Sequence, residues 1–219
     1  MQNVRRREWL LAVILSAVAG GLDAIGFLDL GGYFVSFMSG NTTRMSAETV
    51  EVGWAVAWHA VGLVGLFFVG AVIGSMIAHI GDGRVTVMAA STALVGVSAV
   101  GTLIDALPFP AVLGVAVAMG VLNSTFLRDG EVSIGVTYMT GTLVKAAQRF
   151  GMALMGGPRW VWVRYLSLWA ALAAGSLLGA WAYSAWQIAS LWAVFAVLVI
   201  TTAATWWSRR AQPAQLTQA

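Results

Sequence analysis

The chain has 219 residues, of which 59% are hydrophobic and 10% are charged, and its mean hydropathy is +0.83. Soluble domains carry about 25% charged residues, so this composition excludes a water-soluble protein and predicts a multi-pass membrane protein. The sequence contains no cysteine, which excludes disulfides, thiolate catalysis and cysteine metal sites. The net charge of +3 comes from cations at the ends of apolar stretches, so it indicates membrane topology rather than nucleic-acid binding.

Six apolar stretches are predicted to cross the bilayer as helices. They cover residues 9–28, 54–78, 85–104, 111–127, 160–183 and 190–207. The first follows three arginines and resembles a secretory signal peptide. However, it continues through Gly20-Gly21-Leu22-Asp23, which is echoed in mid-chain by Gly120-Val121-Leu122-Asn123, so we interpret it as a span. A tight turn is expected at 81–84, a proline-containing turn at 105–110, and a polar cytoplasmic tail at 208–219.

A seven-residue motif, VSFMSGN at Val35–Asn41, returns as VTYMTGT at Val136–Thr142. A cation follows at the same step in both copies, Arg44 in the first and Lys145 in the second. An internal repeat of this kind predicts a duplicated architecture. The first repeat covers residues 1–105 with its motif at 33–45, and the second covers 106–207 with its motif at 134–146.

Each half contains three spans, and because three is odd the second half is predicted to be inverted relative to the first. With the N-terminus in the cytoplasm, eleven of the twelve Lys and Arg residues lie inside and only Arg44 lies outside. The second span of each half carries small-xxx-small spacing, which permits close helix packing. The expected fold class is an all-α protein with six transmembrane helices as a 3+3 inverted repeat, with a re-entrant or broken half-helix after the first span of each half.

Each motif is predicted to be an extended segment followed by a helix cap and a short helix. The extended parts are 31–38 and 132–139, the caps are 39–41 and 140–142, and the helices are 42–50 and 143–150. In an inverted repeat, two half-helices enter from opposite faces and their N-termini meet near the bilayer midplane, as in transporter sites. Two alternatives stay open: amphipathic connectors on the membrane surface, and fully crossing broken helices that give eight spans and a parallel repeat.

The candidate site residues follow from this arrangement. Half-helix N-termini carry partial positive charge, which favours an anionic or strongly polar solute. Arg44 and Lys145 are expected to strengthen that positive potential. Asp23 is a carboxylate within a span, which suggests H⁺ or Na⁺ coupling, although a helix-end carboxylate in contact with water explains it equally well. The predicted substrate-binding residues are Ser39, Gly40, Asn41, Thr140, Gly141, Thr142 and Asn123.

No enzymatic or metal chemistry is expected. His59 and His79 have no second histidine at a ligand spacing of three or four residues. Ser39 with His59 suggests an intramembrane serine protease, but Phe37 stands where a nucleophile elbow needs glycine. We therefore predict no catalytic residues, no metal and no cofactor.

The run Gly20–Phe27, followed by Phe34–Asn41, resembles the signature of the YoaK-like family of small bacterial inner-membrane proteins, which carry a domain of unknown function. Ser39 stands where that pattern usually has threonine, which preserves the hydroxyl. The resemblance covers nearly the whole chain. It implies a six-span protein of the bacterial inner (cytoplasmic) membrane and supplies no substrate.

The leading functional hypothesis is transport of a small polar or anionic solute, with the site at the repeat interface. The alternatives are a passive channel of the same architecture and a non-transporting membrane scaffold or partner subunit. The expected partners are the lipid bilayer and the solute, with no nucleic acid, and a homo-oligomer is compatible with the sequence. Both termini are predicted to be cytoplasmic.

Overall fold

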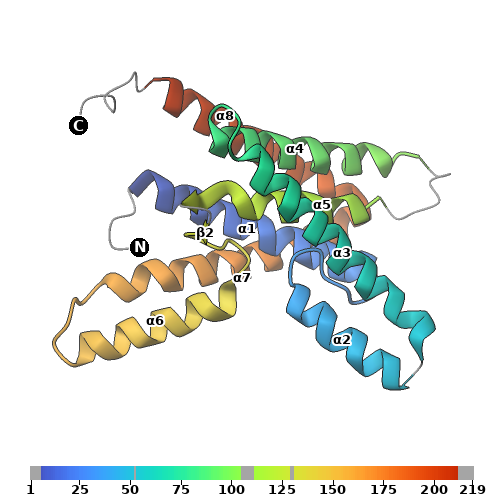
Figure 1. Ribbon diagram of the computed structural model, residues 1–219, viewed down its shortest axis with the longest axis horizontal. Helices are drawn as coiled ribbons and strands as arrows, with labels where there is room; N and C mark the ends of the chain where they lie inside the picture. The colour runs from blue at the N-terminus through green and yellow to red at the C-terminus, as the bar shows by residue number, and fades with distance from the viewer. Residues whose placement is uncertain (1–5, 52, 105–110, 129–130, 212–219) are drawn as a thin grey trace.

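The computed structural model describes residues 6–51, 53–104, 111–128 and 131–211 (Figure 1). The predicted turn at 105–110 and most of the predicted tail lie outside these residues. The long helices are α1 (Arg6–Asp29), α3 (Trp54–Ile77), α4 (Gly83–Gly101), α7 (Val161–Trp186) and α8 (Leu191–Arg210). The shorter elements are α2 (Met38–Glu51), α5 (Leu113–Leu122), α6 (Met139–Leu154), the 3-10 helices η1 (Asn123–Phe126) and η2 (Gln187–Ser190), and the strands β1 (Leu127–Arg128) and β2 (Glu131–Val132).

The chain is an α-helical membrane protein, as its composition predicts. Within the described residues, four stretches are long and apolar enough to cross a bilayer: Arg6–Asp29, Ala57–Ile77, Gly83–Gly101 and Val161–Arg210. The last has 50 residues and contains both α7 and α8, joined by η2. The fourth predicted span is the shorter apolar stretch Leu113–Phe126. Helices therefore stand at all six predicted positions, but one of them is too short to meet the criterion for a span.

Two helix crossings link the first half of the chain to the second, because α1 packs against α7 and α3 packs against α5. Both crossings depend on glycine. A Cβ atom added at Gly175 of α7 would lie 1.9 Å from the Ala17 carbonyl oxygen of α1. A Cβ atom at Gly70 of α3 would lie 2.1 Å from the Val117 carbonyl oxygen of α5. Such contact between backbones is possible only without a side chain, so these glycines fix the two crossings.

Polar contacts gather several helix ends at one end of the molecule. Glu8, in the first turn of α1, forms a 3.0 Å ion pair with Arg84 at the start of α4. Arg84 also donates a 3.4 Å hydrogen bond to the carbonyl of Thr125, just after α5. Asp82, before α4, pairs with Arg209 at the end of α8. The helix α5 therefore ends where α1 begins, so these two helices run in opposite directions.

Contacts between α1 and α7 show that these two helices run in the same direction. Trp9 donates a 3.2 Å hydrogen bond to Ser167 near the starts of both helices. Tyr183 donates a 3.2 Å hydrogen bond to Asp29 near their ends. Fully buried leucines and methionines fill the space around these crossings: Leu15, Leu22, Leu63, Met88, Met119, Leu122, Leu168 and Leu198.

Candidate functional site

The two motif helices begin earlier than predicted. The helix α2 starts at Met38 and α6 at Met139, so the residues predicted as caps lie in the first helical turn. The N–H of Asn41 already bonds the Phe37 carbonyl at 3.2 Å, and the N–H of Thr142 bonds the Tyr138 carbonyl at 3.1 Å. The cap prediction is therefore wrong by about one turn. The helices are also longer than predicted, because they run on to Glu51 and Leu154.

Residues from both motif copies line one cavity of about 270 Å³. In Figure 1, α2 and α6 both begin near the middle of the molecule and run away from each other, α2 to the lower right and α6 to the lower left. The two copies, far apart in the sequence, thus lie side by side in space rather than a bilayer thickness apart. The lining residues are Ser36, Phe37, Met38, Ser39, Phe67, Thr137, Tyr138, Met139, Thr140 and Gly141.

Three of the predicted binding residues, Ser39, Thr140 and Gly141, line this cavity. Asn41 is fully buried and supports the motif instead. Its amide oxygen accepts a 2.9 Å hydrogen bond from the Phe34 N–H, and its nitrogen donates a 2.7 Å bond to the Phe34 carbonyl. Thr142 turns back to its own helix, with a 2.9 Å bond to the Tyr138 carbonyl.

The two motif glycines stand in different surroundings. A Cβ atom added at Gly40 would lie 2.4 Å from the ring of Phe37, so this glycine packs against an aromatic side chain. Gly141 has no atom within 4 Å of its Cβ position, which leaves it open. Of the two, only Gly141 lines the cavity.

Sequence reasoning missed several lining residues. Ser36, Phe37, Thr137 and Tyr138 belong to the repeated motif, and their conservative exchange between the copies was a signal that they share an environment. Phe67 comes from the middle of α3, where one more aromatic residue in an apolar helix gives no sign of its position.

Asp23 holds the first motif in place through three hydrogen bonds. Its Oδ1 accepts bonds from the N–H groups of Val35 at 2.9 Å and Ser36 at 2.6 Å. Its Oδ2 accepts a 2.6 Å bond from the hydroxyl of Ser36. Asp23 is 8% exposed, so this carboxylate is solvated by the protein and not by water.

Asn123 makes the matching contact in the second half. Its Oδ1 accepts a 3.0 Å hydrogen bond from the hydroxyl of Thr137, and its Nδ2 donates a 2.9 Å bond to the Met119 carbonyl. Thr137 corresponds to Ser36 and Asn123 to Asp23, so an equivalent side-chain hydrogen bond joins the preceding helical segment to the motif in each half. We call each of these two hydrogen-bonded pairs, Asp23–Ser36 and Asn123–Thr137, a latch. Neither Asp23 nor Asn123 lines the cavity. Each instead accepts a hydrogen bond from the hydroxyl of a residue that does, Ser36 or Thr137.

The structure does not bring the motif cations to the cavity. Arg44 forms a 2.5 Å ion pair with Glu48, and its guanidinium lies 4.0 Å from the ring centroid of Tyr33. Tyr33 also donates a hydrogen bond to Glu48. The hydrogen bonds from Tyr33 and Arg44 hold the pKa of Glu48 below its usual value. Burial and the contact with Glu48 raise the pKa of Tyr33. Lys145 is exposed on α6.

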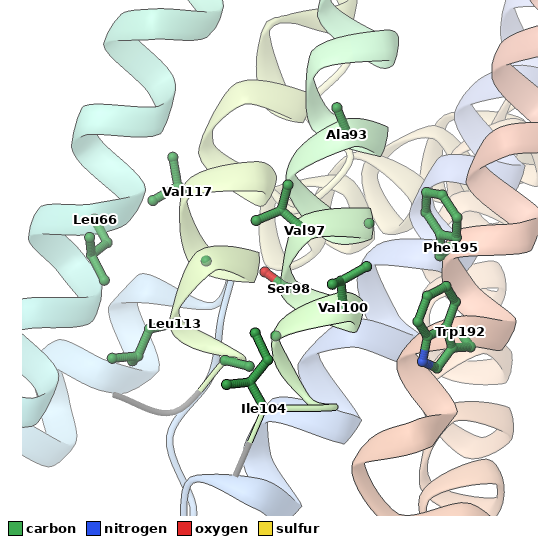
Figure 2. Close-up of a pocket in the computed structure, with 14 residues that line it drawn as sticks. Leu66, Ala93, Val97, Ser98, Val100, Ile104, Leu113, Val117, Trp192 and Phe195 are labelled. Carbon is green, nitrogen blue, oxygen red and sulfur yellow. The ribbon is translucent and has the colours of Figure 1, made fainter. Parts of the chain in front are cut away.

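A second, larger cavity of about 990 Å³ lies between α3, α4, α5 and α8 (Figure 2). Leu66, Val97, Val117, Trp192 and Phe195 contribute apolar surface, and the side chain of Ser98 supplies a hydroxyl. Such a lining suits hydrocarbon and offers little to orient a polar solute. The small cavity between the motifs is therefore the candidate site. Among the described residues, no group of three or more His, Asp or Glu side chains is placed to hold a metal ion.

Comparison with known proteins places the chain in a family. Residues 11–204 match the profile of "Protein of unknown function (DUF1275)". The chain belongs to the DUF1275 family. It is 32% identical to "UPF0700 transmembrane protein RA0705" of Rhizobium meliloti (strain 1021) over 203 aligned residues. The alignment covers 92% of this chain and 88% of that protein. No solved structure matches. The resemblance to a family of unknown function is thereby confirmed, as is a multi-pass membrane protein.

Proposed function

We propose that this DUF1275 protein transports a small polar solute through the cavity between its two motifs, across the bacterial inner membrane. In this proposal the two halves form an inverted repeat of three spans each, and α2 and α6 are half-helices that enter from opposite faces. Both termini face the cytoplasm. Transporters with inverted repeats place their sites at the repeat interface, where the N-termini of broken helices point at the solute.

The observation that carries the proposal is the shared cavity. Its walls come in nearly equal parts from the two motif copies, and it contains the first turns of both α2 and α6. Three further observations support inversion: α1 and α5 run in opposite directions, the crossings α1–α7 and α3–α5 use equivalent glycines, and the latches Asp23–Ser36 and Asn123–Thr137 correspond. A scaffold has no need of polar groups at this depth, since they are costly there.

A swelling assay tests transport without knowledge of the natural solute. Purified full-length protein in liposomes is mixed with iso-osmotic glycerol, glycerate, serine or ethanolamine, and light scattering follows solute entry. We expect at least one solute to enter faster than it enters protein-free liposomes. Equal rates for all four would contradict the proposal. Saturation with solute concentration indicates a carrier, whereas a linear rise indicates the passive channel.

A matched pair of variants ties the flux to the cavity. Gly141→Leu adds a side chain where the cavity is open, so flux should fall to the protein-free rate. Gly151→Leu places the same side chain on the same helix, also with no atom within 4 Å of its Cβ, but away from the cavity lining. Flux through that control should stay at the wild-type rate. Equal loss in both variants would show that the cavity is not the path.

A further inference from the structure

Ser36 and Thr137 both line the cavity, and both already donate their hydroxyl protons within the protein. The amide nitrogen of Asn123 donates to the Met119 carbonyl, so its oxygen faces Thr137 and the Thr137 hydroxyl must be the donor. The Ser36 hydroxyl likewise donates its proton to Oδ2 of Asp23. Each hydroxyl therefore has only lone pairs left to offer a solute.

These lone pairs belong to residues that line the same cavity from opposite copies of the motif. A pair of oxygen acceptors recognises a hydrogen-bond donor or a cation. The helix ends alone predict an anionic solute, but Ser36 and Thr137 have no free hydroxyl proton to donate to an anion. The oxygens of Ser36 and Thr137 therefore form an electronegative pole of the site, whereas the N-termini of the two helices carry partial positive charge.

The charge behind this pole also favours a cation. Asp23 is buried in α1, and no salt bridge within the described part of the chain includes it. Buried charges are normally paired or solvated by several hydrogen bonds, and ionisable groups inside membranes mark ion or substrate paths. A positive group beside Ser36 would lie one hydroxyl away from this carboxylate. In the second half the corresponding residue is the neutral Asn123, so of these two positions only the first places a carboxyl group behind the cavity wall.

The helix ends supply the opposite pole. The first turns of α2 and α6 carry N–H groups without helical partners, and Ser39, Thr140 and Gly141 of these turns line the cavity. Such groups bind carboxylates and other anions. We infer that the cavity takes a small zwitterion of the amino-acid class, with its ammonium group between Ser36 and Thr137 and its carboxylate at the starts of α2 and α6. This inference rests on the proposed transport function and names its substrate class.

Three solutes that differ in one group each test the inference. Serine carries both charges, glycerate replaces the ammonium with a hydroxyl, and ethanolamine lacks the carboxylate. In the same full-length proteoliposomes, we expect serine to enter faster than either of the other two. Faster entry of glycerate or ethanolamine would overturn the zwitterion while leaving transport intact. Entry of none of them would instead contradict transport itself. Glycerate entry that depends on Na⁺ and exceeds serine entry would assign the cationic pole to a Na⁺ ion and would also overturn the inference.

Variants locate the ammonium pole. Thr137→Val keeps the shape of the side chain but removes the acceptor. We expect the KM for serine to rise by about tenfold to a hundredfold, the range that the loss of a hydrogen bond to a charged group gives. The KM for glycerate should rise less than that for serine, because the hydroxyl that replaces the ammonium forms only a neutral hydrogen bond with Thr137. Thr142→Val is the control, because the Thr142 hydroxyl bonds its own helix and does not line the cavity. An unchanged serine KM in Thr137→Val would contradict the assignment.

Discussion

Asp23 and Asn123 occupy matching positions but accept different numbers of hydrogen bonds from the motifs. Asp23 accepts two backbone N–H groups and one hydroxyl, whereas Asn123 accepts one hydroxyl. The sequence suggested a coupling carboxylate or a wet helix end. The structure places Asp23 in a buried latch that fixes Ser36 at the cavity wall. Proton or Na⁺ coupling through this residue stays a prediction.

The first prediction at the residue scale concerns the stability of this latch. Asp23→Ala leaves the N–H groups of Val35 and Ser36 buried without an acceptor, and each such group costs about 1–3 kcal/mol. We expect thermal unfolding in detergent at a clearly lower temperature than for Asn123→Ala, which removes one side-chain acceptor. Asp23→Asn should lie between Asp23→Ala and wild type. Equal unfolding temperatures for Asp23→Ala and Asn123→Ala would show that the three bonds do not hold the motif.

The second residue-scale prediction concerns pH. The pKa of Glu48 lies below its ordinary value of 4.5 in the folded protein because Tyr33 and Arg44 donate hydrogen bonds to it. A carboxyl with a lowered pKa adds stability that is fully present above the ordinary pKa and is lost as the pH falls through the lowered one. Wild type should therefore lose more thermal stability than Glu48→Gln when the pH falls below about 4.5. Glu51→Gln, on the same helix, removes the same charge and should retain the wild-type pH dependence. The same loss in Glu48→Gln as in wild type would contradict this prediction.

At the scale of the element, the two glycine crossings decide how the halves join. Gly70→Ala and Gly175→Ala would each drive a Cβ atom into a carbonyl oxygen of the opposite helix. Overpacking of this kind typically costs about 1–3 kcal/mol. We expect both variants to lower the unfolding temperature by similar amounts. Gly65→Ala on α3 meets no atom within 4 Å and should be neutral or slightly stabilising, since alanine favours helices. A loss in only one crossing would argue against equivalent halves.

Most elements could be predicted from the sequence because apolar length and repeat spacing are strong signals in membrane proteins. The helices were placed within a few residues, and residues from both motif copies line one cavity. The cap at Ser39 was misplaced because a serine is a good cap whether or not the chain is already helical there, and Met38 gives no cue. The pairing of Arg44 with Glu48 could have been read from their spacing of four residues. The contribution of Phe67 to the cavity could not, because it depends on how α3 crosses the motif segments.

At the scale of the whole molecule, each of the two glycine crossings packs a helix of one half against a helix of the other. The helix α1 packs on α7 and α3 on α5, so neither half can bury its glycine face alone. Ion pairs then tie the starts of α1 and α4 to the end of α8. An interlocked arrangement of this kind holds the cavity at the centre while each motif helix remains attached to a different half. Each crossing therefore holds a helix of one half against a helix of the other.

The last prediction tests the inverted repeat on which the proposed site depends. Because the chain has no cysteine, single cysteines report their side of the membrane without background. Three exposed positions near helix ends suit this test: Val50 (87% exposed), Ile80 (60%) and Met155 (76%). If α2 re-enters and the halves are inverted, Val50→Cys should react with an impermeant maleimide from the periplasm. Ile80→Cys and Met155→Cys should react only after the membrane is opened. If the motif helices cross fully in a parallel eight-span repeat, Ile80→Cys reacts from outside, whereas Val50→Cys and Met155→Cys are both protected. That pattern would overturn the inverted repeat and, with it, the meeting of two half-helices at a midplane site.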